Sequence, residues 1–305
     1  MTNPPHPSAT LPSLSIAASG LLWGLWWIPL RQVEAAGLQG AWASIVIFGL
    51  CALLTLPLAW RGRRPNSAEI HNLLIMGVMS GVTLALWNFA LLTGSVVRVT
   101  LLFYLAPVWG TLFGFLFFNL PLRGFRVLTI AFGFAGAVIL LGLEGLGSAP
   151  LSLADGAALI SSIAFALTAT YSRKLGGSIT GWQKTFVSGL MGALFAVPLL
   201  ALPIAAGTPP SPTVIGSAAP YLLICMLWQV LLAWLVMWGS GFVEPGRVTV
   251  LLLLEVVGAA VSAAILTDEP FGLREILGCF FIVGAGLIEG FDEIKASRAA
   301  DQKSA

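Results

Sequence analysis

The segment "RVTLLFYLAPVWGTLFGFLFFNLP", from Arg98 to Pro121, has a second version later in the chain, "RVTVLLLLEVVGAAVSAAILTDEP", from Arg247 to Pro270. The two segments align without gaps. Arg-Val-Thr opens both, proline closes both, and the residues between are mostly apolar. Similarity of this kind is typical of a duplicated structural unit, and the apolar interior predicts a helix that spans a membrane.

The composition predicts that most of the chain lies in a bilayer. Charged residues make up 9% of the 305 residues and hydrophobic residues 58%, whereas roughly a quarter of an ordinary soluble domain is charged. We therefore predict an all-α integral membrane protein whose short linkers leave no room for an extramembrane catalytic domain. The ten predicted spans are 13–31, 40–59, 70–93, 98–119, 125–143, 153–173, 181–205, 218–240, 246–267 and 271–290.

Two shorter matches follow the same order along the chain. "GLCALLTLPL" from Gly49 aligns with "GLMGALFAVPL" from Gly189 if one residue is inserted, and "GAVIL" from Gly136 aligns with "GAGLI" from Gly284. Together with the opening match, they place the second span over the seventh, the fourth over the ninth and the fifth over the tenth. The chain is therefore predicted to be five helices duplicated. A unit with an odd number of spans begins on one side of the membrane and ends on the other, so its second copy has the opposite orientation. Inverted repeats of this kind are a recurrent transporter architecture with a substrate site near the bilayer midplane.

The positive charges divide unequally between the two sides of this topology. Twelve of the 15 Lys and Arg residues fall on the side of the termini, and three, Arg31, Arg98 and Arg274, fall on the other side. The positive-inside rule then predicts a multi-pass inner-membrane protein with both termini in the cytoplasm. The predicted organisation is a cytoplasmic segment (1–12), a first repeat (13–143), an outer linker (144–152), a second repeat (153–290) and a cytoplasmic tail (291–305).

Four motifs give the chain a family resemblance. "WGLWWIPLR" on the first span, "FYLAPVWGTLFGFLF" on the fourth, "LTDEP" after the ninth and "GAGLIEG" on the tenth resemble the EamA type of the drug/metabolite transporter superfamily. Within it the chain is most similar to the YddG-type aromatic amino acid exporters, over roughly residues 13 to 290. The resemblance implies proton-linked or gradient-driven efflux of aromatic and other neutral amino acids. It also implies a basket of helices around a central cavity, with the fifth and tenth spans at its periphery.

Glu255, in "LLLLEVVG" of the ninth span, is the carboxylate that the sequence places deepest in the membrane. An ionisable group in lipid is unfavourable, so it tends to face a cavity or a partner. Two interpretations stay open: a site for a proton or a substrate ammonium, or a protonated carboxyl that hydrogen-bonds to another helix, for example to Gln229. The repeat counterpart of Glu255 is Ala106, so its role is not duplicated.

A polar stripe runs along the fourth span. Thr100, Tyr104, Pro107 and Thr111 follow helical spacing, which puts them on one face. We predict that this face lines a cavity, with the Tyr104 hydroxyl available to a ligand and Pro107 leaving the Phe103 carbonyl without its helical donor. The alternative is ordinary helix packing with a kink at the proline.

Two buried amides each follow a tryptophan. Asn88 follows Trp87 on the third span, and Gln229 follows Trp228 on the eighth. An amide can donate and accept, as the carboxylate and ammonium of a zwitterion require, so all four residues are candidate substrate contacts. Hydrogen bonding between helices is the alternative for the amides, and packing is the alternative for the indoles.

The first span contains "GLLWGLWWIPLRQ", Gly20 to Gln32, with three tryptophans in five positions. Helical spacing places Trp23 and Trp27 on one face and turns Trp26 away toward lipid or packing, while Pro29 is expected to loosen only the last turn. Trp23, Trp27 and, on the fourth span, Trp109 are therefore predicted to bind substrate by stacking and apolar burial. The bound substrate is expected between the first, third, fourth, sixth, eighth and ninth spans.

Several kinds of function lack their sequence signals. The three cysteines have no pair spacing, the two histidines lie near loops, and nucleophile or phosphate-loop motifs are missing, so we predict no metal, no cofactor, no nucleic-acid partner and no enzyme. The remaining prediction is a secondary transporter, monomeric or weakly dimeric, that exports aromatic and other neutral amino acids or related small metabolites. A drug or other metabolite exporter is the alternative, followed by a membrane enzyme or a scramblase.

Overall fold

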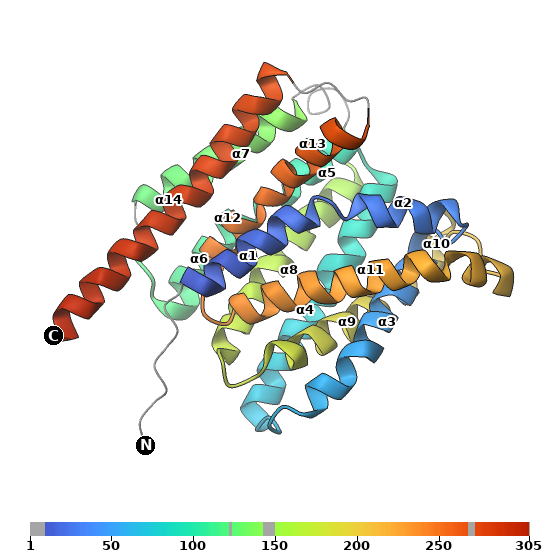
Figure 1. Cartoon of the computed structure of the whole chain (residues 1–305), viewed down its shortest axis with the longest axis horizontal. Helices are drawn as coiled ribbons and strands as arrows, with labels where there is room; N and C mark the ends of the chain where they lie inside the picture. The colour runs from blue at the N-terminus through green and yellow to red at the C-terminus, as the bar shows by residue number, and fades with distance from the viewer. Residues whose placement is uncertain (1–9, 122–123, 143–149, 268–271, 305) are drawn as a thin grey trace.

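The structure is a computed structural model, and it describes residues 10–121, 124–142, 150–267 and 272–304, with side chains described as far as residue 288. These residues form a bundle of helices (Figure 1). The helices are α1 (Thr10–Trp23), α2 (Trp27–Ala35), α3 (Gly40–Trp60), α4 (Ser67–Thr93), α5 (Val96–Phe103), α6 (Ala106–Phe118), α7 (Gly124–Leu141), α8 (Leu153–Leu175), α9 (Gly181–Ala196), η1 (Val197–Ala201), α10 (Pro203–Ala206), α11 (Pro212–Gly239), α12 (Pro245–Leu252), α13 (Leu254–Leu266) and α14 (Leu273–Ser304).

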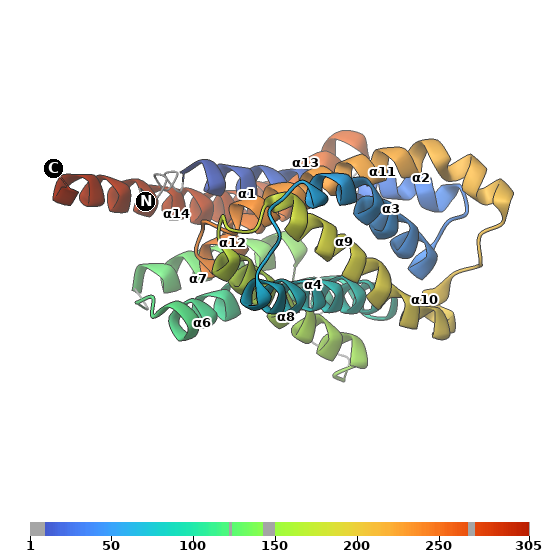
Figure 2. The same ribbon diagram turned by 90° about the horizontal axis from the view of Figure 1, so that it is seen from below.

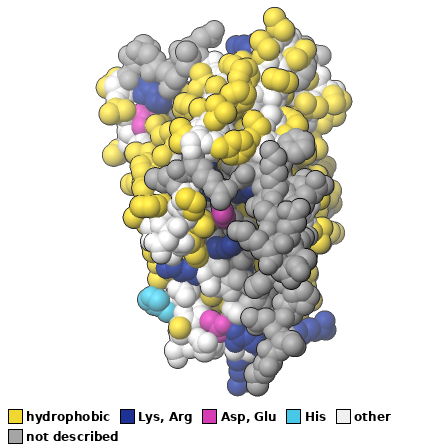
Figure 3. Space-filling model, turned by 90° about the vertical axis from the view of Figure 1, so that its left-hand side faces the viewer, with side chains coloured by type: hydrophobic (Ala, Val, Ile, Leu, Met, Phe, Trp, Pro, Cys, Tyr) yellow, Lys and Arg dark blue, Asp and Glu magenta, His cyan; other side chains and the backbone are white. Residues whose placement is uncertain are grey.

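The described helices confirm the membrane prediction. Nine helical stretches are long and apolar enough to cross a bilayer, and they correspond to the first nine predicted spans. The tenth predicted span falls on α14, which continues without interruption to Ser304. The outer ends of the fifth and tenth predicted spans, at 143 and 271, lie outside the described residues, as do residues 1–9 of the N-terminal segment. Large apolar side chains such as Trp60, Leu151 and Phe280 are exposed on the bundle, and hydrophobic side chains cover much of the face in Figure 3.

Four predicted spans, the first, fourth, seventh and ninth, are not single helices, and this corrects the sequence prediction. The fourth span breaks between α5 and α6 at Tyr104 and Leu105, and the ninth breaks between α12 and α13 at Leu253. Each break is bridged by a tighter bond to the third residue back, as from Leu105 N–H to the Leu102 carbonyl (3.3 Å). In the repeat alignment Tyr104 stands over Leu253, so the two breaks lie at equivalent positions.

The first span breaks as well, at residues 24–26. Trp26 N–H bonds to the Trp23 carbonyl (2.9 Å) in a turn, and α2 begins at Trp27. The prediction that Trp23 and Trp27 share one face assumed a continuous helix, whereas the turn at residues 24–26 interrupts the helical spacing between them. Pro29 lies in the first turn of α2, where its missing N–H breaks no helical bond, and not in a loosened last turn. Trp26 packs against an apolar cluster of α2, α3 and α11, as predicted.

The seventh predicted span, 181–205, is also divided into shorter helices. α9 stops at Ala196, where the Val197 N–H bonds to the Leu194 carbonyl, and η1 and α10 complete the span. Pro198 and Pro203 account for the change because neither can donate the next helical hydrogen bond. The second, third, fifth and sixth spans agree with the prediction to within a few residues at their described ends, whereas α11 begins six residues before the eighth predicted span and α14 runs beyond the predicted end of the tenth.

The packing of the helices confirms the duplication. If the spans are numbered 1 to 10, the counterpart of each span in the first repeat lies five spans later. Span 3 packs on span 6, and their counterparts, spans 8 and 1, also pack together. Span 4 packs on span 6, and their counterparts, spans 9 and 1, do so as well. Spans 2 and 7 are counterparts of each other, as are spans 4 and 9 and spans 5 and 10, and the two spans of each pair are in contact. The α7 and α14 pair lies along one edge of the molecule in Figures 1 and 2, which is the peripheral position that the family resemblance implies.

The bundle has two ends that differ in charge. We call the basic end the one where α8 ends and α9 and α12 begin, because Arg173, Lys174, Lys184 and Arg247 lie there. The opposite end carries Arg31, Arg98 and Arg274. The two repeats meet closely between these ends, at α1 and α13. A Cβ atom on Gly24 would come within 2.2 Å of the Glu255 carbonyl, and one on Gly258 within 2.2 Å of the Leu21 carbonyl. Small residues thus let the backbones of α1 and α13 touch.

Candidate substrate site

Three of the predicted tryptophans form hydrogen bonds from one repeat to the other. The indole N–H donates from Trp27 to the Ser262 hydroxyl (3.0 Å), from Trp109 to the Ser162 hydroxyl (3.1 Å) and from Trp228 to the Leu22 carbonyl (3.2 Å). A buried indole N–H needs a partner, and here each partner belongs to the other half of the chain. These side chains therefore face the contact surface between the two repeats and are not part of a tryptophan belt at the membrane surface.

Glu255 and Tyr104 form a fourth link between the repeats. Glu255 is the second residue of α13, directly after the break at Leu253, and is half-buried. Tyr104 lies in the break between α5 and α6, is 7% exposed, and its hydroxyl is hydrogen-bonded to the Glu255 carboxyl. The interpretation in which Glu255 bonds to Gln229 is wrong, since the partner that the structure gives is Tyr104. The first turn of a helix favours a carboxylate because its N–H groups carry partial positive charge.

Trp87 and Asn88 belong to the contacts of α4. The Trp87 ring lies 4.5 Å from the ring of Phe103, which in turn lies 5.7 Å from the ring of Phe165 on α8. The Asn88 amide donates to the Ser44 hydroxyl of α3 at 2.9 Å. That bond lies within the first repeat, so Asn88 fits the helix-to-helix interpretation at least as well as a substrate contact.

The remaining predicted residues lie near the same breaks. Trp23 is the last residue of α1 and is half-buried, Pro107 is the buried second residue of α6, and Gln229 on α11 is 4% exposed. The far end of the polar stripe differs from the prediction of a cavity wall, because the Thr111 hydroxyl lies against Gly246 of α12. Tyr104 and Thr111 of the stripe therefore face the other repeat.

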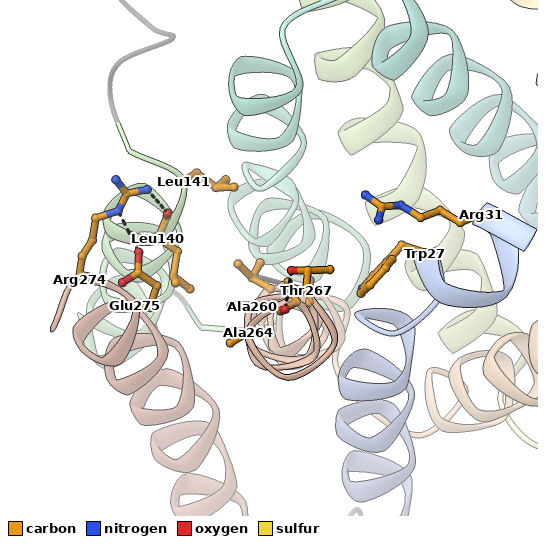
Figure 4. A pocket seen from close by; sticks show the side chains of 12 residues that line it. Trp27, Arg31, Leu140, Leu141, Ala260, Ala264, Thr267, Arg274 and Glu275 are labelled. Carbon is orange, nitrogen blue, oxygen red and sulfur yellow. Dashed lines mark hydrogen bonds and ion pairs between the residues drawn. The ribbon is translucent and has the colours of Figure 1, made fainter. Parts of the chain in front are cut away.

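A pocket of about 510 Å³ lies at the opposite end of the bundle. Figure 4 shows Trp27 and Arg31 on one side, Arg274, Glu275 and Leu140 on the other, and α13 between them. Of the predicted site residues, Trp27 alone is among those lining this pocket. The contribution of α13 was missed, although alanines at positions 259, 260, 263 and 264 follow helical spacing and could have indicated a smooth face.

Three cations are buried among the described residues, Lys184, Arg98 and Arg247, and the sequence analysis did not predict their burial. Lys184 is 1% exposed, and its ammonium donates to the Ser172 carbonyl (2.9 Å), the Ser172 hydroxyl (3.1 Å) and the Gly176 carbonyl (3.0 Å). Arg98 is 8% exposed and pairs with Asp155 at 3.1 Å. All three lie near span ends, where the sequence pattern does not distinguish an exposed cation from one turned inward.

A helical membrane fold of two repeats, with polar and aromatic groups gathered where the repeats meet, defines a multi-pass membrane transporter. Residues 11–142 and residues 152–288 each match the model of the EamA-like transporter family, so the chain belongs to this family. Its members move small molecules across a lipid bilayer. A solved structure described only as "Crystal structure of protein" shares the fold, with a TM-score of 0.71 and 20% identity over 95% of this chain and 98% of that chain. No curated protein matches the chain.

Proposed function

We propose that this transporter exports aromatic and other neutral amino acids, or closely related small metabolites, across the inner membrane. Its two repeats rock against each other, and both termini lie in the cytoplasm. The substrate binds between the repeats, in contact with Trp23, Trp27, Trp87, Asn88, Tyr104, Pro107, Trp109, Trp228 and Gln229, and Glu255 takes up a proton or the substrate ammonium.

The observation that carries this proposal is the set of aromatic hydrogen bonds between the repeats. Trp27, Trp109, Trp228 and Tyr104 each bond across the interface that an alternating-access transporter must open and close. Indole and phenol groups bind planar side chains by stacking, and their N–H and O–H groups can exchange a protein partner for a polar group of the substrate. The positive-inside distribution supports the orientation.

Glu255 is suited to coupling because it has one identified partner and stands where two breaks meet. A substrate ammonium or a proton can each replace the hydrogen bond from Tyr104, so the two would compete for one carboxylate. Such competition is a general means of exchanging a proton for a cationic group. The break at Leu253 gives the carboxyl a helix N-terminus and leaves it accessible from the interface.

The proposal is tested with the full-length chain in proteoliposomes. Flux of labelled Phe, Trp and Thr is measured with and without a pH gradient, for the wild type and for Glu255→Gln, Tyr104→Phe and Trp23→Ala. Wild-type flux is expected to respond to the gradient, Glu255→Gln is expected to lose the response, and Trp23→Ala is expected to lower flux. Glu34→Gln removes an exposed carboxylate of α2 and serves as the matched control.

The outcomes separate the alternatives. Absence of flux for all three amino acids in a folded, monodisperse wild type would overturn the assignment of substrate. A competition panel in which organic drugs displace one another but no amino acid competes would identify a drug exporter. Flux with an unchanged pH response in Glu255→Gln would leave the transport proposal intact and remove Glu255 from coupling.

A further inference from the structure

The two ends of the bundle are not packed alike, although the repeat predicts that they should be. At the basic end α8 packs on α12, which is span 6 against span 9. The counterpart is span 1 against span 4 at the opposite end, where α5 makes no comparable contact with α1 or α2 among the described residues. The repeats are therefore packed together through this pair of helices at the basic end but not through its counterpart at the opposite end, where α5 against α8 and the Arg98 and Asp155 pair join them instead.

Side-chain contacts between the repeats accompany the α8 and α12 packing at the basic end. At the basic end Arg126 of α7 pairs with Glu244 at 2.5 Å, and the Lys174 ammonium of α8 lies 4.2 Å from the ring centre of Phe117 on α6. These contacts join helices of both repeats across the basic end.

The pocket of about 510 Å³ lies at the opposite end, between α2, α13 and the ends of α7 and α14. Its lining follows α13 from Val256, next to Glu255, to Thr267 at the end of the helix. The eleven residue-to-residue steps from Val256 to Thr267 correspond to roughly 16 Å of helix at 1.5 Å per residue. The pocket therefore reaches from the opposite end of the bundle to the depth of the Glu255 and Tyr104 pair, and we call it the outer vestibule.

Arg31 supplies the charge of the outer vestibule. Its guanidinium lies 4.8 Å from the ring centre of Trp27, whose indole is held in turn by Ser262. Among the described residues Arg31 makes no ion pair, whereas Arg274 on the other wall donates to the Leu140 carbonyl (2.8 Å) and lies 3.6 Å from Glu275. Arg31 is thus the cation of the pocket whose charge is not already paired.

We propose that the outer vestibule binds a small carboxylate, with the carboxylate on Arg31 and the apolar part of the molecule against the alanine face of α13. A guanidinium over an indole ring can still form a bidentate bond to a carboxylate through its N–H groups. The volume suits a molecule of amino acid size. The inference deepens the proposed function, because an exported amino acid would place its carboxylate here on leaving the site between the repeats.

Binding of simple carboxylates tests the vestibule separately from transport. Isothermal titration of the detergent-solubilised full chain uses 3-phenylpropanoate, L-phenylalanine and L-phenylalaninamide, which lacks the carboxylate. Arg31→Gln is expected to weaken binding of the two carboxylates by about tenfold, as loss of a charge-assisted bond implies, and to leave the amide unchanged. Arg64→Gln removes an exposed cation outside the pocket and is the matched control.

Accessibility provides a second readout. Ala263→Cys in the alanine face is expected to react with a membrane-impermeant thiol reagent added at the opposite end, and 3-phenylpropanoate is expected to slow that reaction in the Arg31 form but not in Arg31→Gln. Protection that is the same in both forms would overturn the role of Arg31.

Three further results would overturn the inference. They are wild-type affinity in Arg31→Gln, a larger loss in Arg274→Gln than in Arg31→Gln, and binding of oleate without binding of 3-phenylpropanoate, which would make the occupant a lipid. If carboxylates bind as expected while amino acid flux is absent, the vestibule stands and the proposed function fails. If flux is present and Arg31→Gln binds and transports normally, the proposed function stands and the inference fails.

Discussion

At the scale of single residues, the depth of a polar group follows from the sequence more readily than its partner does. Glu255 could be placed inside the ninth span because it interrupts a run of leucines. Its bond to Tyr104 could not be predicted, since the two residues lie on different repeats and meet only because both helices break beside them. Gln229 was the weaker choice of partner because sequence depth says nothing about which faces of two helices meet.

Lys184 provides a prediction at this scale. Its ammonium donates to three acceptors around the last turn of α8, where carbonyl groups without a helical donor favour a cation. Lys184→Met keeps the length of the side chain but leaves those acceptors buried without a donor. We expect the free energy of unfolding to fall by about 2 kcal/mol or more, measured as a lower thermal midpoint in detergent.

Lys174 serves as the control residue for Lys184. Lys174 is exposed and lies over the rings of Phe117 and Tyr171, so Lys174→Met is expected to change the thermal midpoint much less. Equal midpoints for the two variants would contradict the capping role of Lys184.

At the scale of helices, apolar runs gave the positions of the spans but not the breaks within them. Pro107 is a local signal for the break in the fourth span, whereas Leu253 lies in a run of leucine and valine that is compatible with a continuous helix. The break at Leu253 could be anticipated only through the repeat, by transferring the break at Tyr104 to its counterpart. Gly24 is the sequence signal for the break at residues 24–26. A glycine is needed at this position because α1 and α13 pack closely there.

The crossing of α1 and α13 leads to a second prediction. A Cβ atom at Gly24 would meet the Glu255 carbonyl at 2.2 Å and the Ala259 nitrogen at 2.4 Å, and both are backbone atoms that cannot rotate away. Gly24→Ala is therefore expected to separate the helices and to destabilise the protein by roughly 1–3 kcal/mol, the range of overpacked cores. Gly49→Ala meets nothing within 4 Å and is expected to be neutral or slightly stabilising in its helix. A thermal midpoint of Gly24→Ala equal to that of Gly49→Ala would show that the crossing is looser than the structure indicates.

At the scale of the whole molecule, the duplication was predictable and the asymmetry was not. Aligned segments such as those opening at Arg98 and Arg247 report that two halves share a fold. They do not report which pairs of equivalent helices are in contact at a given moment, because a transporter passes through both arrangements with one sequence. The α8 and α12 contact at the basic end and the pocket at the opposite end are therefore properties of the conformation.

The ion pair between Arg126 and Glu244 gives the last prediction, since it must separate when the basic end opens. The two side chains are 12% and 33% exposed, so the pair is worth only about 1 kcal/mol, yet reversing one charge sets two cations face to face. Glu244→Arg should shift the population toward opening at the basic end by a factor of about five, since 1.4 kcal/mol corresponds to tenfold. The population is read from the rate at which Val250→Cys, on buried α12, reacts with an impermeant thiol reagent applied from the basic end. The charge exchange Arg126→Glu with Glu244→Arg restores the attraction and should return the rate to that of the parent. If the exchanged protein reacts as fast as Glu244→Arg alone, the pair does not hold the basic end closed.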